Sequence, residues 1–167
     1  MMGAGKSSVG RCLQRRTGLA RFDTDELVVA KAGMSIPEIF SRQGEGRFRD
    51  LESEALRALP RNESAIIVTG GGIVLRPANV TRLKELGLIV WLEAEEAVLF
   101  ERASRRGNRP LLQTEDPRAT VSELLQTRMP LYEKAADFRV ETTRLTHDEV
   151  CDIILSEIEA RISASQG

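Results

Sequence analysis

The feature that most constrains the fold lies at the start of the chain, in the run Met1-Met2-Gly3-Ala4-Gly5-Lys6-Ser7-Ser8. A Gly-x-Gly-Lys-Ser sequence that leads into a helical pattern is typical of the second half of a phosphate-binding loop. In such a loop, backbone N–H groups and a helix N-terminus meet at one anion site. The lysine reaches the β- and γ-phosphates of a nucleotide, and the serine hydroxyl binds Mg²⁺. Taken alone, so short a motif is equally compatible with chance in a flexible start.

The motif is only partly present in this sequence. The full pattern, G-x-x-x-x-G-K-[ST], requires a glycine at the position immediately before Met1. The apolar strand that normally leads into the loop is also absent from the sequence. We therefore expect a nucleotide-binding fold whose first strand is missing from this chain.

Short apolar runs alternate with helical patterns along the rest of the chain. Ala65-Ile66-Ile67-Val68 is too short for a helix and indicates a strand that is buried on both faces. Residues 19–22, 88–92 and 138–141 predict three further strands. Strands that alternate with helices favour a mostly parallel sheet in a three-layer α/β/α sandwich. The expected helices cover residues 6–17, 26–32, 36–43, 45–59, 79–86, 95–103, 119–129 and 148–162.

Composition excludes several classes of protein. Apolar residues make up 41% and charged residues 29% of the 167 residues, as expected for a single folded domain, 1–167. The net charge of −1 indicates neither a nucleic-acid partner nor a membrane partner. No apolar run is long enough to span a membrane, and no signal segment opens the chain. Cys12 and Cys151 lack metal-ligand spacing, which favours reduced thiols in a cytoplasmic protein. We interpret His147, the single histidine, as a surface residue.

Two carboxylates follow the first expected strand. Asp23 and Asp25 are spaced i, i+2, so both lean to the same side of an extended segment. Ligands of parallel sheets bind beyond the carboxyl ends of the strands, where the glycine-rich start of the chain would also lie. The pair suits a division of labour, with one carboxylate near Mg²⁺ and the other near a substrate hydroxyl. The alternative is that Asp23 or Thr24 only caps the following helix.

Glycines and arginines provide further candidates for binding. Gly70-Gly71-Gly72 follows the second expected strand and lets a ligand approach the backbone closely, although glycine triplets are also ordinary turns. Arg49 and Arg128 lie on expected helices, and a guanidinium group binds a carboxylate through two parallel hydrogen bonds. Most helical arginines are solvated, so sequence alone favours a surface role for each. The basic loop at 104–116 is either an exposed loop or a mobile segment that closes over a leaving phosphate.

The motifs in combination closely resemble those of the shikimate kinase family. The segments that carry the resemblance are Gly-x-Gly-Lys-Ser, Asp-Thr-Asp, Ser-Ile-x-Glu-Ile-Phe, Gly-Glu-x-x-Phe-Arg, Gly-Gly-Gly, Arg-Pro-Leu-Leu and Arg-x-Pro-Leu-Tyr, in this order over residues 3 to about 140. The Asp-Thr-Asp, Phe-Arg and Gly-Gly-Gly segments together separate the chain from nucleoside monophosphate kinases and gluconate kinases. The resemblance implies an enzyme of the P-loop kinase type that transfers the γ-phosphate of ATP to the 3-hydroxyl of shikimate with Mg²⁺.

For the nucleotide, the resemblance implies roles at both ends of the chain. Lys6 matches the phosphate-loop lysine, and Ser7 and Asp23 match the groups that hold Mg²⁺, the latter through water. Arg109 matches an arginine of the lid, about 104–117, that stabilises charge on the transferred phosphoryl group. Adenine contacts are expected from Arg105 or Arg106 and from Arg144. The residues expected to bind ATP are Gly3, Ala4, Gly5, Lys6, Ser7, Ser8, Arg109 and Arg144.

For shikimate, the resemblance implies a site built from residues that follow the strands and lie on the helices at about 24–59. Asp25 matches the carboxylate that binds the ring hydroxyls and takes the proton from the attacking hydroxyl. Arg49 and Arg128 match the arginines that bind the shikimate carboxylate. Gly70, Gly71 and Gly72 line the same pocket. The residues expected to be catalytic are Lys6, Asp25 and Arg109.

The start of the chain leaves rival functions open. In the family's strand order the missing strand lies between the strands that contain Ile66 and Leu88, so two strand edges would lose their partner. One alternative is a truncated, non-catalytic domain that binds a nucleotide or a metabolite. Another is a kinase for a different small hydroxy acid, such as gluconate. Our leading expectation is a cytoplasmic, monomeric shikimate kinase.

Overall fold

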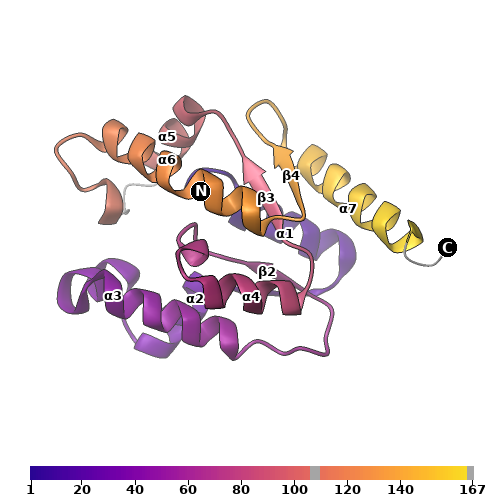
Figure 1. Cartoon of the computed structure of the whole chain (residues 1–167), viewed down its shortest axis with the longest axis horizontal. Coiled ribbons are helices and arrows are strands. Elements are labelled where there is room, and N and C mark those ends of the chain that lie inside the picture. Colours follow the sequence, from indigo (N-terminus) through magenta and orange to yellow (C-terminus); the bar gives the residue numbers. More distant parts are fainter. Residues whose placement is uncertain (106–109, 165–167) are drawn as a thin grey trace.

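The structure, a computed structural model, describes residues 1–105 and 110–164. Short strands alternate with helices, as the sequence predicts (Figure 1). The strands are β1 (Ala20–Asp23), β2 (Ala65–Val68), β3 (Val90–Glu93) and β4 (Phe138–Glu141). The helices are α1 (Lys6–Thr17), α2 (Thr24–Ala32), α3 (Ile36–Arg57), α4 (Pro77–Leu86), α5 (Glu96–Ser104), α6 (Pro117–Ala135) and α7 (His147–Ala164), with the 3₁₀ turns η1 (Ile73–Leu75) and η2 (Pro110–Leu112).

The strands form two parallel pairs. β1 pairs with β2, which places Asp23 opposite Val68. β3 pairs with β4, which places Glu93 opposite Glu141. Within residues 1–105 and 110–164, no strand joins β2 to β3. The expected parallel α/β fold is confirmed, and the gap lies where the missing first strand was expected.

Helices cover both faces of the strands. α1 packs against β1, β2 and α7 and lies behind the strands in Figure 1, whereas α4 and α6 lie in front of them. Gly10 allows α1 to approach β2 closely, because a Cβ atom at Gly10 would lie 2.4 Å from Val68 Cγ2. The close packing holds the start of α1, and therefore the phosphate-binding loop, against the carboxyl end of β2.

α2 and α3 pack against each other and enclose a small hydrophobic core of their own. The Ser35 hydroxyl accepts a hydrogen bond from Glu38 N, and the Glu38 carboxylate accepts one from Ser35 N. This capping box is the one that the sequence Ser-Ile-Pro-Glu predicts. Gly44 has φ 80° and ψ 169°, so it kinks α3 where a break was expected. The residues of this core are Val28, Ile39, Phe48, Leu51 and Ala55.

The end of α6 was predicted incorrectly. The sequence pattern placed the end of this helix at about Met129, but the helix continues through Pro130 to Ala135. A proline inside a helix removes one N–H donor and crowds the preceding turn. Tyr132 and Ala135 are both buried in the main core, and this burial offsets the cost of the proline.

Two strands also differ from expectation. β2 was expected to be buried on both faces, but only Val68 is buried and the other three residues are half-buried. The edge of β2 that does not face β1 has no partner strand among the described residues, which leaves β2 partly open. β3 begins at Val90 and not at Leu88, which is exposed.

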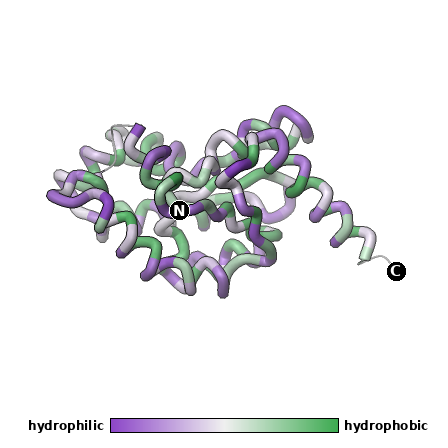
Figure 2. Tube along the Cα trace, turned by 90° about the horizontal axis from the view of Figure 1, so that it is seen from above, coloured by the Kyte–Doolittle hydropathy of each residue, from purple (hydrophilic) through white to green (hydrophobic). Residues whose placement is uncertain are grey.

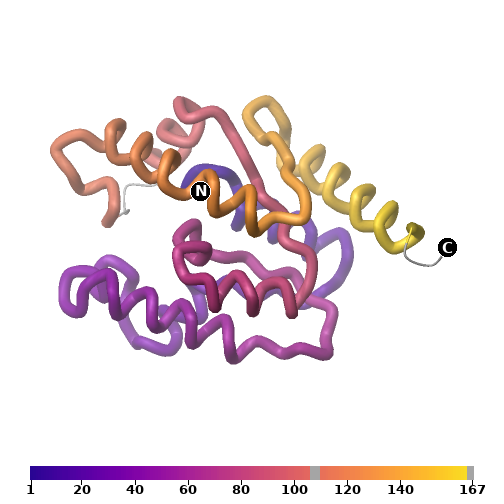
Figure 3. The backbone as a smooth tube through the Cα atoms, in the orientation of Figure 1, coloured from indigo at the N-terminus to yellow at the C-terminus, as the bar shows by residue number. Residues whose placement is uncertain are grey.

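The start of the chain lies inside the molecule. Met1 and Met2 are buried in the main hydrophobic core. Figure 3 shows the N-terminus near the middle of the molecule, beside α6. Met1 Cα is 3.3 Å from the position that a Cβ atom at Gly71 would occupy. The far end of α7, in contrast, projects from the body of the molecule in two perpendicular views (Figures 1 and 2).

Candidate active site

A cavity of about 610 Å³ opens at the carboxyl ends of β1 and β2. The start of the chain, the turn after β1, helix α3, the glycines after β2 and helix α6 all contribute to its walls. Nearly all residues that the sequence nominates for binding therefore come together in one place. Those that line the cavity are Gly3, Gly5, Lys6, Ser7, Ser8, Asp23, Asp25, Arg49, Gly70, Gly71, Gly72, Arg105 and Arg128.

The phosphate-binding loop is formed by glycines with left-handed backbone conformations. Gly3 has φ 77° and Gly5 has φ 88°, and both values are strained for any residue with a Cβ atom. A Cβ atom at Gly3 would also lie 2.4 Å from the carbonyl oxygen of Leu99. Ala4 faces the core and is buried, so it can contribute to the cavity only through its backbone. The loop leads directly into α1, and the N-terminus of a helix is a favourable site for an anion.

Lys6 and Ser7 open α1 at the edge of the cavity. Lys6 Nζ donates a hydrogen bond to the carbonyl oxygen of Met1 at 2.6 Å, so the side chain folds back across the loop. This position places the ammonium group over the backbone that would bind phosphate. The loop therefore has the backbone, the helix terminus and the cation that phosphate binding needs.

Asp23 links β1 to α2. Its Oδ1 atom accepts a hydrogen bond from Asp25 N at 3.1 Å and caps α2, as the alternative interpretation of the sequence expected. Its Oδ2 atom lies 3.4 Å from Arg21 Nη1. Asp23 nevertheless lines the same cavity as Ser7. One carboxylate and one hydroxyl fit Mg²⁺, which takes few protein ligands beside waters and substrate phosphates.

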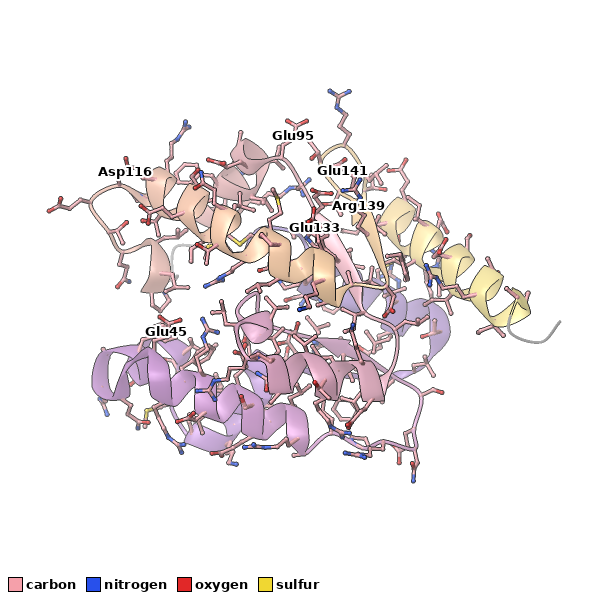
Figure 4. The ribbon with its side chains drawn as sticks, viewed as in Figure 1. Glu45, Glu95, Asp116, Glu133, Arg139 and Glu141 are labelled. Atoms are coloured by element: carbon pink, nitrogen blue, oxygen red, sulfur yellow. The ribbon has the colours of Figure 1, made fainter. Side chains whose placement is uncertain are left out.

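Arg49 of α3 lines the cavity, although the residue is only 8% exposed. Its Nη1 atom donates to Glu52 Oε2 at 2.9 Å, and its Nη2 and Nε atoms donate to Glu45 Oε1 at 2.8 and 3.1 Å. Figure 4 shows Glu45 on the side of α3 that faces the segment leading into α6. Burial opposes the charge of Arg49, but Glu52 and Glu45 outweigh it and raise the pKa of Arg49. Arg49 is therefore a fixed cation at the cavity wall.

Glu52 was missed by the sequence analysis. Glu52 is fully buried, and its Oε1 atom has no hydrogen-bond partner among the described residues. Burial raises the pKa of Glu52, the positive charge of Arg49 lowers it in part, and the nearby carboxylate of Asp25 raises it further. The signal in the sequence is its position three residues after Arg49, which places both on one face of a helix.

α6 supplies the opposite wall. Arg128 is 4% exposed and lines the cavity, so it is a second buried cation and not a solvated surface residue. Tyr132, one helical turn later, donates a hydrogen bond from its hydroxyl to the carbonyl oxygen of Gly71 at 2.6 Å. Burial raises the pKa of Tyr132, and the charge of Arg128 opposes this effect. The extension of α6 beyond Pro130 thus supports the glycine turn.

At the other end of the cavity lie two residues that the sequence analysis did not assign to the site. Arg102 of α5 lines the cavity, and its Nη2 atom donates to the carbonyl oxygens of Thr142 and Thr143 at 3.1 and 3.3 Å. His147 is exposed, as expected, but its Nε2 atom is 3.6 Å from the position of a Cβ atom at Gly5. Thr146 and Glu149 form a capping box at the start of α7. This sequence signal places His147 in the first turn of a helix, although it does not show that the helix begins beside the cavity.

The remaining candidates are arginines that were expected to bind ATP. Arg144 is exposed and does not line the cavity. Arg105 does line it. Arg106 and Arg109 lie outside the described residues.

Comparison with known proteins identifies the family. A sequence model of shikimate kinase matches residues 2–159. The chain belongs to the shikimate kinase family. It is 49% identical to the shikimate kinase of Thermodesulfovibrio yellowstonii over 95% of this chain and 91% of that protein. It is 42% identical to the shikimate kinase of Burkholderia lata over 95% of this chain and 86% of that protein.

Solved structures agree with the sequence comparison. Shikimate kinase from Acinetobacter baumannii in complex with shikimate superposes with a TM-score of 0.91 at 36% identity, covering 96% of this chain and 89% of that chain. Shikimate kinase from Aquifex aeolicus superposes with a TM-score of 0.81 at 33% identity, covering 97% of this chain and 94% of that chain. The TM-scores show that this chain shares the fold of these shikimate kinases.

The expected activity is therefore confirmed. The chain is an ATP-dependent shikimate kinase, a transferase that uses Mg²⁺. Within residues 1–105 and 110–164, no helix is both long and apolar enough to span a membrane.

Proposed function

We propose that this one cavity, at the carboxyl ends of β1 and β2, binds both substrates: shikimate against α3 and α6, and the triphosphate of ATP over the phosphate-binding loop. The observation that carries this proposal is the location of two buried arginines, Arg49 and Arg128, on the same cavity as Asp25 and Lys6. Burying a cation carries a large desolvation cost; Glu52 and Glu45 offset part of it at Arg49, and an anionic substrate would offset more at both arginines. The roles of individual residues follow from this arrangement.

Arg49 and Arg128 bind the carboxylate of shikimate. Guanidinium groups match a planar carboxylate with pairs of hydrogen bonds, and the partly closed cavity strengthens these interactions. Glu45 is half-exposed and occupies the Nε edge of Arg49, so its side chain turns away when the substrate carboxylate enters. Gly70, Gly71 and Gly72 form the adjacent wall, where backbone can approach the ring.

Asp25 binds the ring hydroxyls and accepts a proton. The 3-hydroxyl oxygen forms a bond to the γ-phosphorus, and the bond from that phosphorus to the bridging oxygen of ADP breaks. The hydroxyl proton passes to the Asp25 carboxylate. The protein contributes mainly by aligning the two substrates and neutralising charge.

ATP binds to the loop at the start of the chain. The backbone N–H groups of Gly3, Ala4, Gly5, Ser7 and Ser8 surround the phosphates, and Lys6 contacts the β- and γ-phosphates. Ser7 and Asp23 would hold Mg²⁺, which neutralises phosphate charge when bound. Arg109 stabilises the transferred phosphoryl group as the lid at about 104–117 closes.

The adenine end is assigned to residues beside α5 and α7. Arg102 and His147 line the cavity at that end, and a guanidinium or imidazole plane can stack on a purine. Arg105 also lines the cavity, so we retain it as a further adenine contact. Arg144 does not line the cavity, so we no longer assign it to adenine. One copy of the chain supplies every group named, so we propose that the protein acts as a monomer, which gel filtration tests. We also propose a cytoplasmic location, which cell fractionation tests.

The assignment of the shikimate end is tested with Asp25→Asn and Arg49→Ala. Truncating one partner of a buried charge pair costs about 2–5 kcal/mol, so we expect kcat/KM for shikimate to fall at least about 30-fold in Arg49→Ala. ATP binding, measured by calorimetry, stays near the wild-type value in both variants. The matched control is Arg42→Ala on the same helix, since Arg42 is exposed and makes only a 3.8 Å surface pair with Glu38. Wild-type turnover of both active-site variants would refute the proposal.

A further inference from the structure

The two walls of the shikimate end come from adjacent strands whose pairing stops just before the site. β1 and β2 run parallel, and their last paired residues are Asp23 and Val68. Beyond this point β1 ends, because α2 begins at Thr24 and its backbone turns away from β2. The chain after β2 continues through Thr69 to Gly70 without a backbone partner from the neighbouring strand. Another group must therefore hold the start of the glycine turn.

The Thr24 side chain provides that connection. Thr24 is 0% exposed, and its Oγ1 atom accepts a hydrogen bond from Gly70 N at 3.2 Å. The hydroxyl oxygen thus replaces the carbonyl oxygen that a longer β1 would have offered. Because threonine is branched at Cβ, its χ1 angle is stiff, and the acceptor stays in one place. The ladder between β1 and β2 continues by one hydrogen bond beyond the end of the strand.

Gly70 has almost no freedom to move at this point. A Cβ atom at Gly70 would lie 2.6 Å from Glu52 Oε1 and 3.0 Å from Asp25 Oδ1, so the two carboxylates sit directly against its Cα. The next residue, Gly71, is held through its carbonyl oxygen by the Tyr132 hydroxyl. A shift of the Gly70 backbone would therefore change the distance between the glycine turn and Asp25.

We propose that Thr24 is a positioning residue for the shikimate end, which fixes the separation between the Gly70–Gly72 turn and Asp25. The proposal rests on the function proposed above for that end of the cavity. Thr24 touches no substrate. It sets the width of the slot into which the hydroxylated ring of shikimate must fit, with the glycine backbone on one side and the Asp25 carboxylate on the other.

The variants Thr24→Val and Thr24→Ser separate this role from simple packing. Valine has the same shape but no acceptor, so Gly70 N–H loses its partner while the buried volume is retained. Serine keeps the hydroxyl and loses only a methyl group. A neutral hydrogen bond is worth about 0.5–1.5 kcal/mol, so we expect KM for shikimate to rise about three- to tenfold in Thr24→Val. KM for ATP stays unchanged, and Thr24→Ser restores most of the affinity for shikimate.

Thermal unfolding and Asp25→Asn complete the experiment. If Thr24 is only a packing residue, Thr24→Val will match the wild type in shikimate KM, or both KM values will change together with the unfolding temperature. Either result overturns the proposal. If Asp25→Asn leaves shikimate turnover intact, the function proposed for this end of the cavity fails first. If Asp25→Asn loses activity but Thr24→Val has the wild-type KM for shikimate, the role proposed for Thr24 is refuted and the function proposed for this end of the cavity stands.

Discussion

Arg49 is the residue on which most contacts of the shikimate end converge. Its guanidinium group binds Glu52 and Glu45 on one side and lies against Gly72 on the other. A Cβ atom at Gly72 would be 2.2 Å from Arg49 Nη1 and 2.4 Å from its Cζ atom. Because Arg49 is buried and paired with two carboxylates, it cannot move aside without breaking charged hydrogen bonds. The third glycine of the triplet is therefore required for the position of this arginine.

We expect Gly72→Ala to weaken shikimate binding through Arg49. The new methyl group displaces the guanidinium, and loss of hydrogen bonds to a charged group is worth about 1.5–3 kcal/mol, or roughly 10- to 100-fold in shikimate KM. Steady-state kinetics with each substrate varied in turn measures the effect, and KM for ATP should not change. Gly46→Ala is the matched control, since Gly46 lies in α3 and a Cβ atom there meets nothing within 4 Å. A normal shikimate KM in Gly72→Ala would contradict this explanation.

Glu52 should make stability depend on pH in the direction opposite to that of most carboxylates. Burial raises the pKa of Glu52, so the folded protein holds this proton at a higher pH than the unfolded chain does. The unfolding free energy contributed by Glu52 is thus fully present below about pH 4.3, the ordinary glutamate pKa, and is lost as pH rises through the folded pKa. The charges that face it are Arg49, Asp25 and Arg128.

We expect urea unfolding of the wild type and of Glu52→Gln to diverge as the pH rises above about 4.3, the ordinary glutamate pKa. The glutamine cannot ionise, so the variant should lose less stability than the wild type as the pH increases. Glu149→Gln serves as the control, because hydrogen bonds from Thr146 lower the pKa of Glu149 and its contribution is already complete above its unfolded pKa. Parallel pH profiles for wild type and Glu52→Gln would show that the buried carboxyl stays ionised.

Some site residues could be predicted from the sequence more readily than others. Asp23, Asp25 and the three glycines could be predicted, because they directly follow runs with strand character. Glu52 has a weaker signal, because its position three residues after Arg49 places both on one helix face but does not show that this face points inward. His147 was treated as a surface residue, which is correct for its exposure. Its place beside Gly5 depends on how α7 packs against α1, a contact between the two ends of the chain.

At the scale of elements, local rules predicted most boundaries. β2 and β4 begin and end at the expected residues, and Gly18 ends α1 with φ 72°. These features depend on β-branched runs, glycine conformation and capping, all of which are local. α6 was predicted too short because its continuation past Pro130 depends on tertiary contacts. The hydrogen bond from Tyr132 to Gly71 joins residues 61 positions apart, which no local pattern reveals.

At the scale of the whole molecule, the main feature is the separation of the two strand pairs. β2 and β3 each have one strand neighbour in the described part of the chain. A second cavity, of about 540 Å³, lies near the amino end of β2, and its apolar lining comes from elements on both sides of the gap. The apolar residues that line it are Leu19, Phe22, Leu59, Pro60, Ala65, Ile67, Leu86, Leu88 and Ile158. Unpaired strand edges beside a cavity that is lined in part by apolar residues are favourable positions for another parallel strand.

We expect a chain extended before Met1 by five apolar β-forming residues and a glycine to be more stable and to bind ATP more tightly. The added strand would pair with β2 and β3, and the glycine would complete the phosphate-binding pattern that ends at Ser7. Each buried apolar side chain contributes about 1.5–3 kcal/mol, whereas ordering each residue costs about 1–2 kcal/mol. Together with the new backbone hydrogen bonds, we expect the unfolding free energy to increase by on the order of 3–5 kcal/mol. Urea unfolding and ATP calorimetry measure both effects against a control extension of equal length made of Gly and Ser. Equal behaviour of the two extensions would show that the gap between β2 and β3 does not accept a strand.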